Sequence, residues 1–389
     1  MDAARYFLNL AKSAQNVCLY NCDQGDAYLI NSFDVAKKVL TSPGFGCTSH
    51  PFLSLRPLLS PSGLAWLGIE NSASESDALM QRVQKFFDFY ACLDTCERAL
   101  GTNLLPSAEF YFDVKAMFFS LSTSILFNFN LSTDATDIAY ASDLIENIRS
   151  GSDSQGQYDQ HQTSLNQELA TTTVLRHLAT RIQRHCGRDP VEYLTHAIIE
   201  TLLNATVPLA YSFLWTLVLL GRQESIQHML WNEGMEKGSG DSLFLSFPQK
   251  LAYTTVIKES LRLYPPVWAI GRTCMETQIL SGATIRQGEP VVVSPYALHR
   301  SPVYWSRSNI FHPDRFRANA SQTYGFMPFG VGVKRCPAAR WNIPFLSLAL
   351  RWFLNKYSIS VGKLPQHFSL VALRPSSSFS ASIRARHNL

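Results

Sequence analysis

Apolar residues recur at helical spacing over several long stretches, which predicts a mainly α-helical protein. Two of these stretches cover residues 75–101 and 113–129, and helical spacing then dominates up to about Leu263. The pair Pro265–Pro266 should end the last of these helices, because proline lacks the amide donor and disfavours helical geometry in the residue before it. A further helix is expected directly after Cys336.

Shorter patterns predict a small β component. The segments V-C-L-Y-N-C and D-A-Y-L-I-N flank a Gln-Gly pair, which is typical of a hairpin, and F-D-V-A-K-K-V-L then has the spacing of a short helix. Between Val267 and Ser294, short apolar runs separated by turn signals such as Ser281–Gly282 indicate strands. Residues 50–70 and 149–168 are rich in polar or turn-forming residues and predict surface connections.

Composition bounds the class of protein. The chain has 389 residues and no linker that divides it into two balanced halves, so we expect a single domain over residues 1–389. Hydrophobic residues make up 46% and charged residues 16%, which is enough apolar surface for an extensive core. A net charge of +4 is too small to indicate nucleic-acid binding.

No feature of the sequence predicts a membrane anchor. The longest apolar stretch, residues 202–220, is interrupted by polar residues and by Pro208, and the first residues lack the basic start and apolar block of a signal peptide. We therefore expect a cytoplasmic protein. Its eight cysteines are spread thinly, which in that compartment favours free thiols over disulfides.

Cys336 stands out because it lies near the end of the glycine-rich stretch F-M-P-F-G-V-G-V-K-R-C-P-A, just before a predicted helix. Gly330 and Gly332 allow the backbone to approach a flat ligand closely. The positive end of the helix dipole, Lys334 and Arg335 are expected to favour thiolate over thiol, and a thiolate is a strong ligand for iron. A buried cysteine in a turn is the alternative on these residues alone.

The spacing within this stretch resembles that of the haem-binding loop of the cytochrome P450 superfamily. That loop has Phe, two residues, Gly, one residue, a basic residue, one residue, Cys, one residue, then Gly or Ala. Phe329, Gly332, Lys334, Cys336 and Ala338 match it at every position.

Two further motifs strengthen the resemblance. The segment K-E-S-L-R is similar to the family's Glu-x-x-Arg helix, and its Glu259 and Arg262 are three residues apart, so they share a helix face and can pair. The segment H-P-D-R-F is similar to the family segment in which an arginine, here Arg315, completes a Glu-Arg-Arg cluster. The three motifs occur in the family's order.

The resemblance implies the cytochrome P450 fold, a triangular and mainly α domain with a small β region that holds haem b. It implies that Cys336 is the axial ligand of the haem iron, and that Glu259, Arg262 and Arg315 are structural. Lys334 and Arg272 fall where the family places cationic partners of the haem propionates. His299 is a further cofactor-binding candidate, although a core or surface histidine fits equally. The other cofactor-binding residues implied are Phe329, Gly330 and Gly332.

The predicted central helix departs from the family pattern, which places an acid and then a threonine over the haem to relay protons. In the stretch L-L-N-A-T-V-P-L-A, these places fall on Val207 and Pro208, and a register that uses Thr206 as the alcohol puts Ala205 in the place of the acid. Thr206, Asn204 or ordered water would then have to relay the proton. Pro208 either kinks the helix or is a packing irregularity.

The leading hypothesis is a monomeric haem-thiolate monooxygenase that inserts one oxygen atom of dioxygen into a small apolar substrate. Its electrons would come from a separate carrier of the ferredoxin or flavodoxin type, received by the basic residues on the cysteine side. The alternative is a peroxide-using or non-oxidative P450 (peroxygenase, isomerase or dehydratase), because the acid-alcohol pair is missing. A non-catalytic haem or ligand-binding protein with the same fold is the third possibility. Those basic residues are Lys334, Arg335, Arg340, Arg351 and Lys356.

Overall fold

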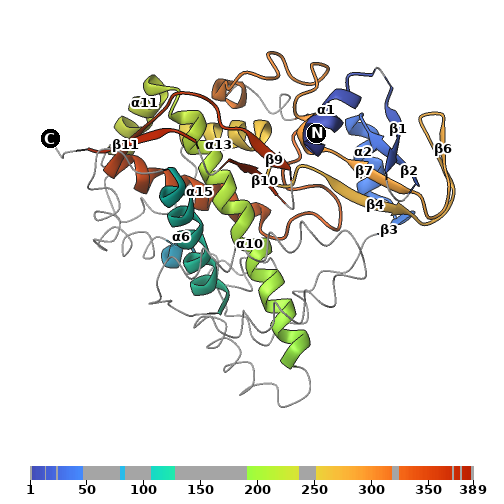
Figure 1. The fold of residues 1–389 in the computed structure, drawn as a ribbon, viewed down its shortest axis with the longest axis horizontal. Helices are drawn as coiled ribbons and strands as arrows, with labels where there is room; N and C mark the ends of the chain where they lie inside the picture. The colour runs from blue at the N-terminus through green and yellow to red at the C-terminus, as the bar shows by residue number, and fades with distance from the viewer. Residues whose placement is uncertain are drawn as a thin grey trace. The chain divides into compact units, whose positions relative to one another are not determined.

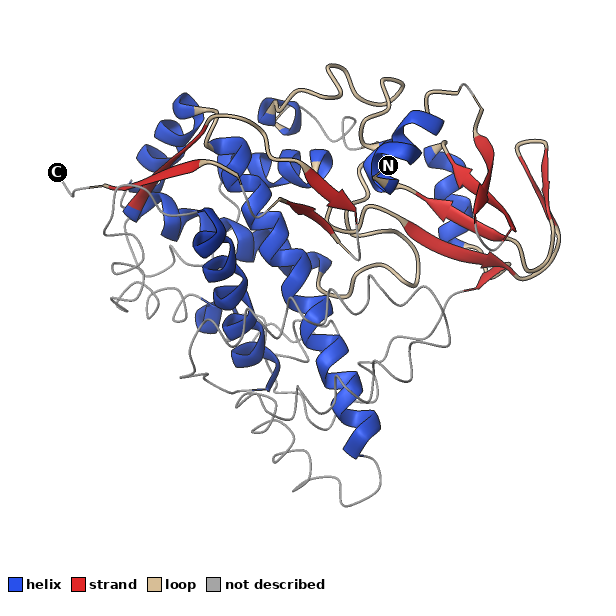
Figure 2. Cartoon of the chain, in the orientation of Figure 1, coloured by secondary structure: helices blue, strands red, loops and turns tan. Residues whose placement is uncertain are grey.

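The structure is a computed structural model, in which α-helices and short strands alternate along the chain (Figures 1 and 2). Most of the predicted helix at 75–101 and both predicted surface connections lie outside the described residues. The structure describes residues 2–13, 15–22, 25–46, 79–83, 107–127, 191–235, 251–317, 324–369, 372–376 and 379–386.

The chain forms two compact units, each assembled from separated segments. The first, which we call the sheet unit, consists of Met1–Ser49, Lys250–Ile343 and His367–Arg374. The second, the helical unit, consists of residues 50–249, 344–366 and 375–389. Because these segments interleave along the sequence, no single cut in the chain separates the units. The single domain expected over residues 1–389 stays a prediction.

A five-stranded sheet forms the centre of the sheet unit, in the order β1-β2-β7-β4-β3. The predicted hairpin is confirmed, since β1 (Val17–Cys22) pairs antiparallel with β2 (Gly25–Ile30). β7 (Pro290–Val293) runs parallel to β2 and antiparallel to β4 (Ile270–Cys274). β3 (Phe45–Gly46) pairs antiparallel with β4 at the edge. Strands from residues 17–46 and from residues 270–293 therefore share one sheet.

The predicted turn at Ser281–Gly282 joins two short strands, β5 (Gln278–Leu280) and β6 (Ala283–Ile285), which pair antiparallel. Ser281 has φ 48° and Gly282 has φ 87°. Such angles cost little only for glycine, which explains the residue at the second position.

The sheet unit also contains helices and a short 3₁₀ turn. α1 (Ala3–Leu10) is capped by Asp2, whose carboxylate accepts the Arg5 amide. α2 (Phe33–Thr41) confirms the predicted short helix, and α13 (Leu251–Leu263) ends before the double proline, as predicted. α14 and the 3₁₀ turn η3 follow in the sequence. The bounds of those two elements are Pro295–Leu298 and Pro313–Phe316.

Two long helices lie side by side in the helical unit (Figure 1). α6 (Ser107–Phe127) begins six residues before the predicted helix at 113–129, and α10 (Val191–Leu220) runs on through Pro208. α11 (Glu224–Met235) follows α10 directly. The unit also contains the antiparallel strand pair β8 (Tyr357–Val361) and β11 (Ala381–Ala385).

α15 (Ala339–Lys356) begins three residues after Cys336, which confirms the helix expected there. It continues through Pro344. Beyond it, β9 (His367–Ser369) and β10 (Leu373–Pro375) form a two-stranded sheet. The sequence patterns did not predict these last strands.

Among the described residues, no single helix has the length and apolar character needed to cross a bilayer. The residues of α10 and α11 pass that test only as a pair, Asn204–Leu220 with Glu224–Gly234, and the pair is bent by 115°.

Gln227 holds the end of α10, α11 and β8 together. Its buried side-chain amide donates to the carbonyl oxygens of Leu220 and Ile359, each at 2.8 Å, and its Oε1 accepts the Ile359 amide at 3.1 Å. Leu220 and Ile359 are both buried, so the Gln227 side chain supplies hydrogen bonds that water cannot. The Leu220 carbonyl also accepts the Gln223 amide at 2.8 Å.

We expect Gln227→Leu to lower the free energy of unfolding by about 2–4 kcal/mol, because it removes the side-chain hydrogen bonds to the buried amide and carbonyl of Ile359 and one of two donors to the Leu220 carbonyl. Urea titration followed by circular dichroism measures this loss. Ser225→Ala, an exposed position on the same helix, should change it by less than about 0.5 kcal/mol. Equal stability of the two variants would contradict the assignment.

Candidate active site

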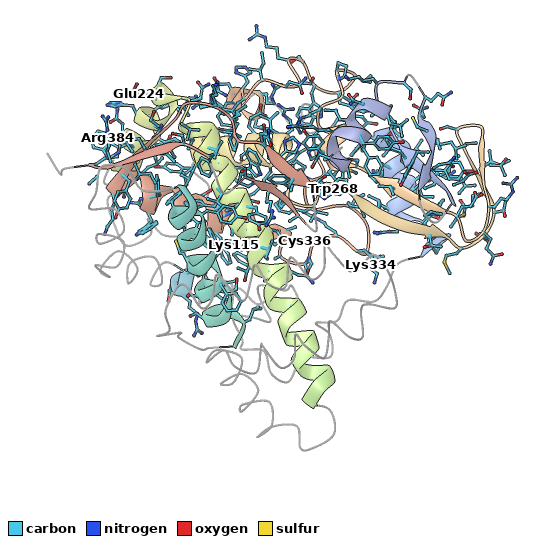
Figure 3. The ribbon with its side chains drawn as sticks, viewed as in Figure 1. Lys115, Glu224, Trp268, Lys334, Cys336 and Arg384 are labelled. Atoms are coloured by element: carbon cyan, nitrogen blue, oxygen red, sulfur yellow. The ribbon has the colours of Figure 1, made fainter. Side chains whose placement is uncertain are left out.

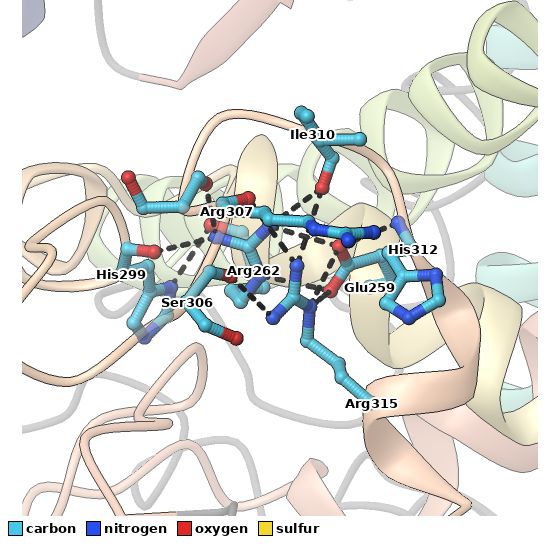
Figure 4. A network of polar contacts seen from close by, with 9 residues as sticks. Glu259, Arg262, His299, Ser306, Arg307, Ile310, His312 and Arg315 are labelled. Carbon is cyan, nitrogen blue, oxygen red and sulfur yellow. Dashed lines mark hydrogen bonds and ion pairs between the residues drawn. The ribbon is translucent and has the colours of Figure 1, made fainter.

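A buried carboxylate joins α13 to η3 in the sheet unit (Figure 4). Glu259 and Arg262 lie one turn apart on α13 and are both fully buried. The Nε and one Nη of Arg262 donate to the two carboxylate oxygens, each at 2.8 Å. Arg315, from η3, donates its Nε at 3.0 Å, and the His312 amide donates at 2.9 Å. The predicted pairing of Glu259 with Arg262 and Arg315 is present.

Backbone carbonyl oxygens receive the remaining guanidinium donors. Arg262 donates to the carbonyls of His299 at 2.7 Å and Ser308 at 2.6 Å. Arg315 donates to the carbonyl of Ser306 at 2.9 Å. Because two cations face a single carboxylate, these carbonyl dipoles offset the remaining positive charge. The cluster thereby fixes the irregular segment between α14 and η3.

His299 extends this network towards the cysteine loop. Its Nδ1 lies 3.2 Å from the Arg262 carbonyl oxygen, and its Nε2 accepts the Met327 amide at 2.9 Å. A carbonyl only accepts and an amide only donates, so the ring is neutral with its proton on Nδ1. Both ring nitrogens are therefore engaged within the protein. This position does not match the cofactor-binding role predicted for His299, and the core-histidine alternative describes it better.

The cysteine loop begins at Met327 and is closed by its own backbone. The Gly330 amide donates to the Met327 carbonyl at 3.0 Å, and the Cys336 amide donates to the Phe329 carbonyl at 2.8 Å. Gly330 and Gly332 have φ 68° and 79°. A Cβ on Gly332 would lie 2.5 Å from the backbone oxygen of Leu40 in α2. Glycine at 332 therefore allows the loop to rest against that helix.

Donors surround the half-buried Cys336 sulfur, whose position at the end of the loop is labelled in Figure 3. The Asn342 amide nitrogen donates to it at 3.8 Å. Burial raises the pKa of the Cys336 thiol, while the Ala338 amide, the Asn342 side chain and the Arg335 charge lower it. The expectation that these surroundings favour thiolate is thus wrong in net direction, because burial outweighs the donors.

Arg272 lies on the same side of β4 as the cysteine loop. Ile270 approaches the loop, since its Cδ1 lies 3.6 Å from the point that a Cβ on Gly330 would occupy. Alternate residues of a strand point to the same face, so Arg272 shares the face of Ile270, and it is 8% exposed. Lys334 lies on the loop itself and is half-buried. These two cations and the sulfur suit an anionic cofactor held by a thiolate.

On α10, the two proposed relay residues point in different directions. Thr206 is fully buried, whereas Asn204 is exposed. Residues two apart on a helix do not face each other, so the structure does not bring these side chains together. The Thr206 hydroxyl has no hydrogen-bond partner among the residues that the structure describes. It is the better placed of the two to meet a partner from outside the chain.

Comparison with known proteins identifies the family. A family model described as cytochrome P450 matches residues 138–379, more than half of the chain. The chain belongs to the cytochrome P450 family. The P450 match includes the Glu-x-x-Arg helix, the segment of Arg315 and the cysteine loop. The cofactor of this family is haem b.

Two curated relatives show how far the likeness extends. Cyclooctatin synthase of Streptomyces melanosporofaciens is 36% identical over 160 residues, which cover 40% of this P450 and 35% of the relative. Germacrene A hydroxylase of Barnadesia spinosa is 33% identical over 147 residues, which cover 36% of this chain and 29% of the relative. The matched region therefore spans about a third of the length of these relatives.

The fold agrees with the family. The crystal structure of a cytochrome P450, CYP102L1, superposes with a TM-score of 0.75 at 14% sequence identity, covering 98% of this chain and 94% of that chain. The predicted P450 fold, mainly α with a small β region, is confirmed.

The sequence patterns missed two contributors to the site. The link from His299 to Met327 crosses 28 positions in the chain, so no local motif announces it. Asn342 lies six residues after Cys336 and on the first turn of α15. The available signal was a polar residue close to the start of the helix that follows the candidate ligand Cys336.

We expect Glu259→Gln to lower the free energy of unfolding by about 3–5 kcal/mol, because it leaves two buried guanidinium ions without their counter-charge. Thermal and urea denaturation measure the loss. Glu276→Gln makes the same substitution at an exposed site and should cost less than about 0.5 kcal/mol. Equal stability of Glu259→Gln and wild type would remove the structural role of the cluster.

The pH dependence of stability should reveal His299. Burial, reinforced by the Arg262 charge, lowers the pKa of His299 to about 3 from an ordinary 6.5. Between these pH values His299 is protonated in the unfolded chain but stays neutral in the folded protein. The free energy of unfolding therefore falls as the pH is lowered from about 6.5. The stability advantage of wild type over His299→Gln should therefore shrink between pH 7 and pH 4. A constant difference in urea titrations across that range would refute this assignment.

Proposed function

We propose that this P450 is a haem-thiolate monooxygenase, with Cys336 as the axial ligand of the iron. When bound, the haem supplies the activation of dioxygen and the transfer of one oxygen atom to an organic substrate. The observation that carries the proposal is the Cys336 sulfur at the end of a glycine-turned loop, with N–H donors directed at it. Cys336 would hold the iron as a thiolate, because a thiol that coordinates a metal ion is deprotonated.

Two cations would hold the acidic edge of the cofactor. Arg272 lies on the face of β4 that meets the cysteine loop at Ile270, and Lys334 lies on the loop itself, two residues before Cys336. Carboxylate groups bind guanidinium ions through paired hydrogen bonds, which fixes orientation as well as position. Phe329, Gly330 and Gly332 would form a flat and apolar surface against which the porphyrin packs.

Thr206 is the residue that we propose for proton delivery. A buried hydroxyl without a partner costs about 1–3 kcal/mol, so its place on α10 indicates a partner that arrives with substrate, oxygen or water. Its neighbours Val207 and Pro208 have no side-chain proton to give. A single alcohol therefore has to receive its proton through water.

This gap in the relay favours one alternative, a P450 that uses peroxide or rearranges it. Peroxide already contains the reduced oxygen atoms and their protons. Such chemistry therefore does not require side chains that deliver protons at the positions of Val207 and Pro208.

The substrate that we propose is a small apolar molecule. The name of the relative germacrene A hydroxylase states a hydroxylation, which supports oxygen insertion as the reaction.

The exposed residues beside the sulfur include Arg335 and Arg340. Their charge suits an acidic ferredoxin or flavodoxin as electron donor to a monomeric P450.

Turnover by the purified haem protein tests the function. We expect product only when a reduced carrier and dioxygen are both present, and Cys336→Ser should lose both turnover and the carbon monoxide difference band of thiolate ligation. Cys18→Ser, a substitution at another buried free cysteine, should keep the band.

Product formed with a hydroperoxide alone, and none with reductant and dioxygen, would establish the peroxide alternative. Survival of the thiolate band in Cys336→Ser would move the ligand to another cysteine.

A further inference from the structure

Asn342 approaches the sulfur from α15, independently of the loop. Its side-chain nitrogen lies 3.8 Å from Cys336 Sγ, within the longer range of hydrogen bonds to sulfur. Its backbone amide donates to the Ala338 carbonyl at 3.1 Å. The residue is thus anchored to Ala338, whose own amide also acts on the sulfur. Two N–H donors, one from the backbone and one from a side chain, converge on one atom.

The other end of the same amide is buried without a partner. Asn342 Oδ1 has no hydrogen bond within the part of the chain that the structure describes. Such an orphaned acceptor costs about 1–3 kcal/mol. Alanine at this place would avoid the cost and is the best helix former. Packing and helix propensity therefore do not explain an asparagine at this position. The hydrogen bond from its side-chain nitrogen to the Cys336 sulfur does.

We propose that Asn342 is a positioning residue that sets the electron-donating strength of the axial sulfur, by donating an N–H hydrogen bond to Cys336 in the haem-bound protein. This inference rests on the proposed function of Cys336 as iron ligand.

The physical basis is the charge on a coordinated thiolate. A hydrogen bond to an anionic acceptor is stronger than one to a neutral thiol, so the contact gains strength when iron binds. It draws electron density from the sulfur that would otherwise pass to the iron. Hydrogen bonding around a haem ligand is one of the means by which proteins set its reduction potential. Removing the donor should therefore favour the ferric state and shift the potential to more negative values.

The test compares ferric-to-ferrous midpoint potentials of the haem-loaded protein and its variants. For Asn342→Ala we expect about a tenfold change in the ferric-to-ferrous ratio at fixed potential in favour of ferric iron, about 59 mV for a one-electron couple. Asn342→Leu, which restores bulk without a donor, should shift the same way. The iron-sulfur stretching frequency, measured by resonance Raman scattering, should rise in both variants.

Asn355→Ala is the matched control. It makes the same substitution thirteen residues further along α15, where Oδ1 is also buried without a partner in the described part of the chain. At a fixed potential, its ferric-to-ferrous ratio should equal that of wild type within a factor of two. Loss of a buried amide from this helix is thereby separated from loss of the bond to sulfur.

The inference is overturned if Asn342→Ala changes the ratio by less than threefold or in the opposite direction. It is also overturned if Asn342→Leu keeps the wild-type potential, since bulk alone would then explain the alanine result. In either case a wild-type thiolate band leaves the proposed function intact. Absence of that band in wild type overturns both the function and the role of Asn342.

Discussion

One buried carboxylate, that of Glu259, holds the segments around the cysteine loop in their places. It faces two guanidinium ions, from α13 and η3, and these ions in turn bind the carbonyl oxygens of the segment between α14 and η3. The arrangement is rigid because each charge is shielded from water and has several partners, so no single group can leave without exposing the others. Glu259 lies on the regular helix α13, whose backbone fixes the position of the carboxylate.

The network reaches the sulfur through backbone contacts. The His299 carbonyl accepts a hydrogen bond from the Arg262 guanidinium, the His299 Nδ1–H donates to the Arg262 carbonyl, and His299 Nε2 accepts the Met327 amide. From Met327 the loop turns through two glycines with positive φ and returns to the amide of Cys336. A histidine that stays neutral is needed for this link, because only the unprotonated Nε2 can accept. Hydrogen bonds within the protein therefore position the loop.

Local patterns determined much of the fold. The hairpin β1-β2, the helix α2, the end of α13 before Pro265 and the start of α15 after Cys336 all follow from spacing and turn residues close in sequence. The parallel pairing of β2 with β7 and the pairing of β8 with β11 escaped prediction, because the paired strands lie far apart along the chain.

The sequence by itself determined the family and the candidate ligand, since the spacing around Cys336 and the pair Glu259 and Arg262 are local chemical signals. Only the tertiary structure decided which groups meet at the sulfur and what His299 does. Asn342 and Met327 gain their roles from hydrogen bonds formed after folding. The direction of the Cys336 pKa was likewise a matter of burial, which no neighbouring residue in the sequence reveals.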